Sequence, residues 1–141
     1  MVKTGAGLNK GSKKVNTPGY YLHIEPGKSM IGGGLYQPES AILSKVRQEI
    51  DYNQDEWINL ITSKQLKKYF KSIPDITDRL VRAPKGYDES NPLIEYLKLK
   101  SFVVTRPLKD EEVLHRDFLK IIVQSFKSLK PIITFLQRVY E

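Results

Sequence analysis

Residues 19–36 read GYYLHIEPGKSMIGGGLY, and this stretch decides the fold. Two short β-rich segments flank Pro26-Gly27, a dipeptide that is typical of tight turns. The stretch therefore predicts a β-hairpin with strands at about residues 19–25 and 29–35. The glycine run of residues 32–34 allows the backbone conformations that a bulge or a close approach of two chain segments requires.

One face of the first predicted strand carries three polar or titratable side chains. Side chains alternate across a strand, so Tyr21, His23 and Glu25 share a face. The imidazole could act as a general base that the carboxylate orients, or the pair could be a structural hydrogen bond on a half-exposed strand. A metal site would need a third ligand, and no sequence signal places His115 nearby. We expect no metal and no cofactor.

Composition limits the class of protein. The 141 residues are 40% hydrophobic, which is enough for one domain with one core. The absence of cysteine excludes disulfides, zinc–thiolate sites and a cysteine nucleophile. No apolar run approaches the roughly 18 residues of a membrane span, and the N-terminal stretch lacks the apolar core of a secretory signal. We therefore expect a soluble cytoplasmic protein that does not bind a membrane.

The net charge of +7 is concentrated near the N-terminus. Residues 1–16 contain four lysines and no acid, which leaves +3 for the remainder. We expect a flexible Lys- and Gly-rich segment over residues 1–17 and a single α+β domain over residues 18–141. The basic segment could bind nucleic acid weakly through phosphates, but a solvated chain end is the simpler interpretation.

Apolar periodicity predicts helices after the hairpin. Apolar residues recur every four positions from Ile42 to Ile50, which indicates a helix over about residues 38–52. Asn53, followed by Glu56, resembles a capping box for a second helix. Ser63 is suited to cap a third, short helix.

The C-terminal part completes an α+β fold. Residues 101–106 are rich in β-branched and aromatic side chains, which predicts a strand. Residues 117–140 show helical spacing, and Pro131 is expected to kink or divide this long helix. Because helices and strands are grouped rather than alternating, we predict a small antiparallel sheet, formed by the hairpin and this strand and covered on one face by helices of residues 38–70 and 117–140.

A basic loop forms a second candidate for binding. Arg79, Arg82 and Lys85 stand near Pro84 and Gly86, with no acidic residue between them. Such a loop could grip an anionic ligand. Charges of this kind more often keep a loop solvated, so both interpretations stay open.

The motifs of the hairpin resemble those of the domain-of-unknown-function family 2461, whose members occur in bacteria and fungi. The segments YYLHIEPG (residues 20–27) and GGGLYQPE (residues 32–39) look like its signature. The segments KGY, LKLKSFVV and RPL (residues 85–87, 97–104 and 106–108) follow in the order that the family shows. The resemblance covers nearly everything from Lys3 onward and implies no particular activity.

Members of that family normally carry a further N-terminal region, helical at first and then Arg-rich. The chain therefore resembles the C-terminal two-thirds of a member. If the full domain pairs His23 and Glu25 with arginines from the additional region, the site in this chain is incomplete.

Three classes of function follow from these observations. We expect a ligand- or partner-binding module that takes a small anionic ligand or a protein through the polar face of the hairpin. Its candidate residues are Tyr21, His23, Glu25, Arg79, Arg82 and Lys85. The alternatives are a hydrolase that acts on an anionic substrate with His23 as base, and weak nucleic-acid binding. An unpaired sheet edge or the C-terminal helix could also form a homo-oligomer.

Overall fold

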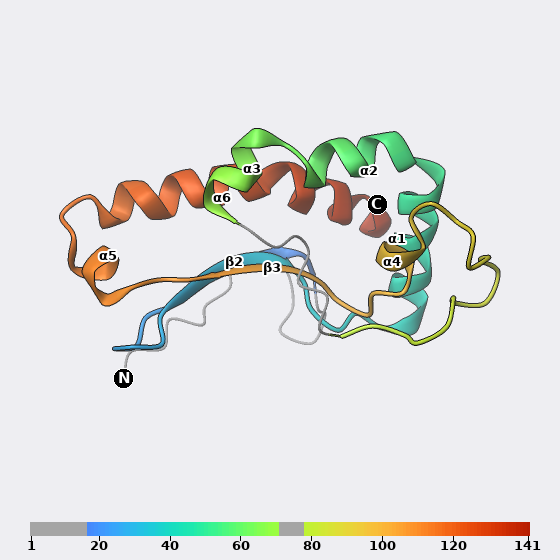
Figure 1. Ribbon diagram of the computed structural model, residues 1–141, viewed down its shortest axis with the longest axis horizontal. Helices are drawn as coiled ribbons and strands as arrows, with labels where there is room; N and C mark the ends of the chain where they lie inside the picture. The colour runs from blue at the N-terminus through green and yellow to red at the C-terminus, as the bar shows by residue number, and fades with distance from the viewer. Residues whose placement is uncertain (1–16, 71–77) are drawn as a thin grey trace.

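Three antiparallel strands in the order β1-β2-β3 form one sheet, with α6 lying across it (Figure 1). The computed structural model describes residues 17–70 and 78–141. Its strands are β1 Gly19–His23, β2 Met30–Leu35 and β3 Phe102–Pro107. Its helices are α1 Ser40–Tyr52, α2 Gln54–Ile61, α3 Lys64–Tyr69, α4 Ile94–Leu97, α5 Asp110–Leu114 and α6 Phe118–Gln137, followed by the 3-10 turn η1 Arg138–Tyr140. The predicted α+β class is confirmed.

The register of the sheet separates its two faces. Leu22 of β1 pairs with Ile31 of β2, which pairs with Arg106 of β3. His23 pairs with Met30, which pairs with Pro107. Because directly paired residues share a face, the Ile31 face meets α6 and the His23 face points the other way. The hairpin prediction is confirmed, and the third strand begins one residue later than expected.

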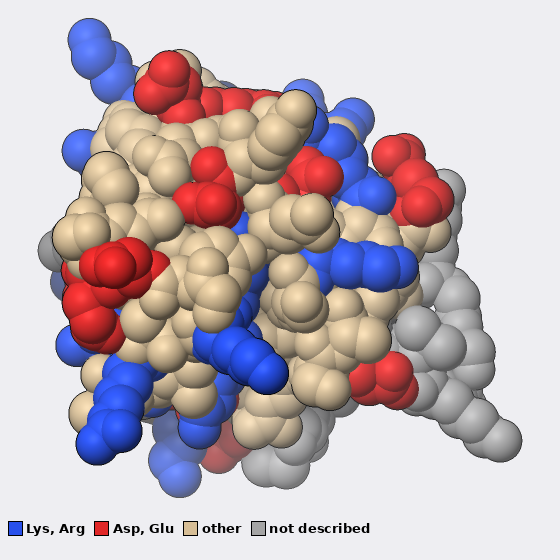
Figure 2. Space-filling view, turned by 90° about the vertical axis from the view of Figure 1, so that its right-hand side faces the viewer, with Lys and Arg blue, Asp and Glu red and all other residues tan. Residues whose placement is uncertain are grey.

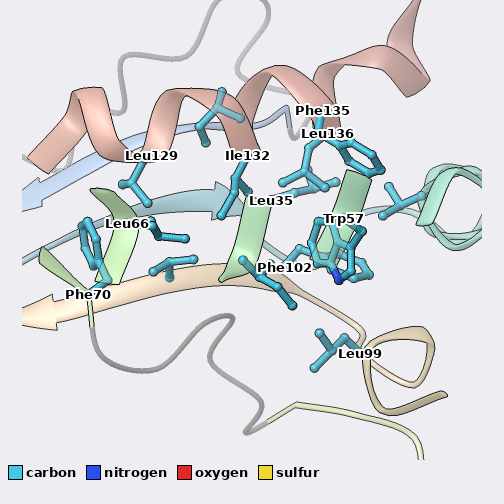
Figure 3. Close-up of a cluster of buried hydrophobic side chains, with 14 of the residues drawn as sticks. Leu35, Trp57, Leu66, Phe70, Leu99, Phe102, Leu129, Ile132, Phe135 and Leu136 are labelled. Atoms are coloured by element: carbon cyan, nitrogen blue, oxygen red, sulfur yellow. The ribbon is translucent and has the colours of Figure 1, made fainter. Parts of the chain in front are cut away.

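The core lies between the sheet and α6 (Figure 3). Leu35 and Phe102 from the sheet and Leu129 from α6 are at most 1% exposed. Gly33 allows this close approach, since a Cβ there would lie 3.1 Å from Leu129 Cδ1 and 2.9 Å from the Gly19 carbonyl oxygen. The glycine run therefore has a packing role.

Helices α2 and α3 pack against α6. The Trp57 ring of α2 lies 5.3 Å from the Phe135 ring of α6 and 6.2 Å from the Phe102 ring of β3, which joins the two helices to the sheet. Helix α6 continues through Pro131 without interruption, so the alternative that Pro131 divides it is wrong. Buried residues on both sides of the proline, Leu129 and Ile132, hold the helix on the core.

Of the two predicted helix caps, the one at Ser63 is confirmed and the one at Asn53 is wrong. Ser63 caps α3 as predicted, and its hydroxyl accepts a hydrogen bond from the Leu66 N–H at 3.1 Å. The predicted capping box of Asn53 and Glu56 is absent, because the Asn53 side chain forms no cap hydrogen bond with α2. Asn53 is the single residue between α1 and α2, and its amide donates to the Glu49 carbonyl at 3.1 Å. The end of α1 therefore uses the side chain that the pattern assigned to α2.

Some predictions fall outside the described residues. The Lys-rich segment of residues 1–17 lies there, apart from Thr17. Within the two described ranges, no helix combines the length and the apolar character that crossing a bilayer requires.

Candidate functional site

The candidate site begins at the end of β1, where the backbone is firmly held. Ser29 is 3% exposed, and its hydroxyl accepts from the Glu25 N–H at 2.9 Å and donates to the Glu25 carbonyl at 3.0 Å. The Lys28 N–H also donates to that carbonyl, at 2.8 Å. Gly27 has a φ of +76°, which a glycine adopts without strain. These bonds fix the backbone of Glu25 against Lys28 and Ser29, across the turn that follows β1.

Tyr21, His23 and Glu25 are brought together. His23 Nε2 lies 2.8 Å from Glu25 Oε1, and the two side chains are 12% and 21% exposed. The Tyr21 and His23 rings are nearly parallel, at 4°, with their centroids 6.4 Å apart. The geometry therefore orients the imidazole from two sides, by a hydrogen bond on one edge and by a parallel ring.

The other ring nitrogen of His23, Nδ1, is buried and has no hydrogen-bond partner in the described part of the chain, a state that it shares with Trp57 Nε1 and Arg106 Nε. With neutral His23 donating from Nε2 to Glu25, Nδ1 is a lone-pair acceptor; with protonated His23, it is a donor. A buried polar atom without a partner costs roughly 1–3 kcal/mol, and a ligand that supplied a partner would remove this cost.

On the sheet face that carries Tyr21 and His23, the neighbouring strand β2 has glycines at positions 32 and 34. Gly32 pairs with Tyr21 on one side and with Thr105 on the other. A Cβ at Gly32 would lie 2.4 Å from the Val104 carbonyl oxygen, and one at Gly34 would lie 2.0 Å from that of Phe102. Close pairing with β3 therefore requires both glycines. They do not by themselves indicate a ligand.

Helix α5 is tied to the same end of the sheet. Asp110 Oδ1 accepts from the Gly27 N–H of the turn at 2.9 Å. Glu112 accepts from the Lys109 N–H at 3.0 Å and from Arg106 Nη1 at 3.1 Å. The Lys109 bond, with the Arg106 bond and charge, holds the pKa of Glu112 below its ordinary value. The sequence did not predict these contacts. The one feature that could have indicated them is the run of acidic residues at the start of α5.

The basic loop lies at the opposite end of the sheet. Arg79 forms a β-bridge with Leu99, close to the start of β3, whereas His23 belongs to the row that ends at Pro107. Six residues of β3 span about 17 Å. The structure therefore separates Arg79 from His23, and the six predicted residues do not form one site.

The loop is held by its own ion pairs. Arg79 pairs with Glu95, and Lys98 Nζ lies 2.9 Å from Glu89 Oε1. The hydrogen bond with Glu89 raises the pKa of Lys98, and the same bond lowers the pKa of Glu89. Arg82 and Lys85 are exposed. Figure 2, which views the molecule from the right of Figure 1, shows cations and anions interspersed, with no continuous basic patch.

Sequence reasoning also missed Arg47 of α1. Its Nε donates to the Leu97 carbonyl at 2.7 Å and its Nη2 to the Leu99 carbonyl at 3.2 Å. Burial lowers the pKa of Arg47. The residue therefore anchors the end of α4 to α1, and no local pattern could have revealed partners 50 residues away.

Two cavities lined by described residues lie away from His23. One, of about 410 Å³, lies between α3, α5 and α6 and includes Tyr69, Glu111 and His115. The other, of about 540 Å³, lies between α2 and α6. Across residues 17–70 and 78–141, no group of three or more His, Asp or Glu side chains is arranged to hold a metal ion.

Comparison with known proteins gives the family. The family described as conserved hypothetical protein (DUF2461) matches residues 2–135, nearly the whole chain. The chain therefore belongs to this family, as its hairpin motifs predicted. None of the curated proteins and none of the solved structures matches it. The family description names no activity.

Proposed function

We propose that the protein is a ligand-binding module that holds a small anionic ligand at the His23 end of the hairpin. The observation that carries this proposal is the buried, unpartnered Nδ1 of His23. Glu25 occupies the opposite nitrogen at 2.8 Å, so only Nδ1 is left to a ligand.

The chemistry of the pair favours an anion. When His23 is protonated, the Glu25 carboxylate accepts from Nε2 and balances the positive charge. Nδ1–H is then a donor without an acceptor, and an anionic oxygen supplies one. Because Nδ1 is buried, neighbouring side chains have to move aside when the ligand enters.

A hydrolase is the second candidate, because the same geometry serves a neutral imidazole. Glu25 would then fix the tautomer that carries its proton on Nε2, and Nδ1 would act as the base. Such an enzyme also needs a second polar group that converges on the reacting atom. In the described part of the chain, no polar group hydrogen-bonds to Nδ1. This difference favours binding over catalysis.

The proposal can be tested by NMR because the chain has only two histidines, His23 and His115. Histidine-labelled protein is titrated with inorganic phosphate, and His115→Gln assigns the ring signals. We expect saturable shifts of the His23 ring nitrogens and no comparable shift at His115, whose exposed Nδ1 accepts from the Asp117 N–H at 3.1 Å. Equal shifts of both rings, or none at His23, would contradict the proposal.

One substitution separates the roles of the two ring nitrogens of His23. His23→Gln places an amide nitrogen near the position of Nε2 and keeps the bond to Glu25, but it has no counterpart of Nδ1. We expect this variant to lose phosphate-induced shifts at neighbouring amides while its melting temperature stays close to that of the wild type. Retained binding in this variant would show that Nδ1 does not hold the ligand.

We also propose that the protein acts in the cytoplasm. Its sequence contains no cysteine, which is compatible with a reducing compartment. Fractionation of cells that express the chain, followed by immunoblotting, tests this location directly.

A further inference from the structure

The groove between α2 and α6 has a larger volume than the cavity between α3, α5 and α6. The lining residues of the groove come from α2, from the second half of α6 and from η1. Figure 1 shows α2 running above that half of α6. The groove has a volume of about 540 Å³, within the range of small-molecule sites. It is lined by Glu56, Leu60, Lys127, Lys130, Pro131, Thr134, Phe135 and Arg138.

The charged side chains of the groove are mainly cationic. Lys127, Lys130 and Arg138 come from one side of α6 and η1, at positions i, i+3 and i+11, over about 16 Å of helix. Glu56 is the single acid of the lining, and its Oε2 lies 2.7 Å from Arg138 Nη2. Neither lysine has a carboxylate within ion-pair distance in the described chain. The groove therefore offers two cations to an anion from outside.

The groove also has an apolar wall, formed by the half-buried Leu60 and the exposed Pro131. The Phe135 ring is 2% exposed and is held between the Arg138 guanidinium, whose Cζ lies 4.3 Å from the ring centroid, and the Trp57 ring. Pro131, which is exposed in the middle of α6, adds a rigid apolar surface between the two lysines and Phe135. Since Arg138 is fixed by both a ring and a carboxylate, part of the groove is organised before any ligand binds.

Pro131 also changes the backbone beside the lysines. A proline has no N–H, so the carbonyl of Lys127 lacks the donor that it would have in a regular helix. The proline lies on the groove side and not among the buried residues of α6. Its position is therefore not explained by packing of the core.

We propose that this groove binds a small organic anion with an apolar body, of the class of medium-chain aliphatic carboxylates. The body lies on Leu60 and Pro131, and the carboxylate lies between Lys127 and Lys130. This site is independent of the one at His23, which belongs to the other face of the sheet.

The test uses octanoate as the probe and the full chain as the protein. Octanoate is titrated into ¹⁵N-labelled protein, and octan-1-ol, which has the same length and no charge, serves as the matched ligand. We expect saturable amide shifts confined to α2 and to the second half of α6, with weaker binding of the alcohol. The emission of Trp57, the only tryptophan, should change in parallel because its ring contacts Phe135.

The double variant Lys127→Gln/Lys130→Gln should weaken octanoate binding about tenfold, as expected for the loss of two partly solvated charge contacts. Lys120→Gln is the matched control, because Lys120 is an exposed lysine of the same helix that lines the other cavity. Equal loss in the control, equal binding of the alcohol, or shifts outside the groove would overturn the proposal. So would binding of a hexaglutamate peptide without binding of octanoate, which would make the groove a docking site for an acidic segment.

Discussion

At the end of the sheet where β3 begins, the cations Arg47 and Lys98 are held by hydrogen bonds and an ion pair, whereas at the end where β3 finishes two buried nitrogens have no hydrogen-bond partner among the described residues. Arg47 donates to two carbonyls and Lys98 pairs with Glu89. At the other end, His23 Nδ1 and Arg106 Nε are buried and form no hydrogen bond with any described residue. Trp57 Nε1, beside Phe102 at the start of β3, is likewise buried without a partner among the described residues. Charge alone therefore does not mark a site, because the cations Arg47 and Lys98 serve the fold.

Arg47→Met should have the largest effect, because it tests the claim that the paired end is structural. The substitution keeps the length of the side chain but leaves the Leu97 and Leu99 carbonyls without their charged donor. We expect the free energy of unfolding to fall by about 3 kcal/mol, measured by urea denaturation. Arg82→Gln is the control at the same end, and we expect it to change stability by less than about 0.5 kcal/mol. A larger loss for the Arg82 variant would break the distinction between anchoring and solvated cations.

The pattern of residues predicted the fold well because the hairpin is encoded locally. Alternation along β1, the Pro26-Gly27 turn and the apolar spacing of α6 each depend on neighbours within a few residues. The polar face of Tyr21, His23 and Glu25 could be derived for the same reason. No local pattern places the basic loop relative to that face. In the structure, the length of β3 separates the loop from His23.

The partners that organise both ends could not be derived from the sequence. Arg47 meets carbonyls about 50 residues later in the chain, and Asp110 meets the Gly27 N–H 83 residues away. Every residue type except proline has the same backbone N–H and C=O groups. The sequence therefore does not reveal which backbone group a distant side chain binds. The unpaired state of His23 Nδ1 depends on everything packed around it, and it becomes visible only in three dimensions.

Glu112→Gln should have an intermediate effect, and it tests how α5 supports the end at His23. Glu112 accepts from the Lys109 N–H and Arg106, and we expect the variant to lose about 1 kcal/mol at neutral pH. The folded-state pKa of Glu112 lies below its ordinary value of 4.5, so its stabilisation is complete above that pH and is lost as the pH falls through the folded-state pKa. The difference between wild type and variant should therefore shrink below about pH 4.5.

Urea denaturation at a series of acidic pH values measures this dependence. Glu111→Gln is the matched control, since Glu111 is the exposed neighbour on the same helix. A difference between the Glu112 variant and the wild type that stays constant down to low pH would show that the carboxylate does not act through its charge.

The smallest effect on stability is expected for His23→Gln, and it bears most directly on the comparison of the two ends. The glutamine keeps a donor for Glu25 and removes the unpartnered nitrogen, so the loss of ring packing against Tyr21 is offset, and we expect a change within about 0.5 kcal/mol. His23→Asn keeps the position of Nδ1 and removes that of Nε2. Its shorter amide lies near the position of Nδ1 and leaves the Glu25 carboxylate without its donor, which should cost about 1–2 kcal/mol. Thermal and urea unfolding of the two variants measure the order. If the asparagine variant is the more stable one, Nδ1 contributes to the fold, and its lack of a partner no longer indicates a ligand.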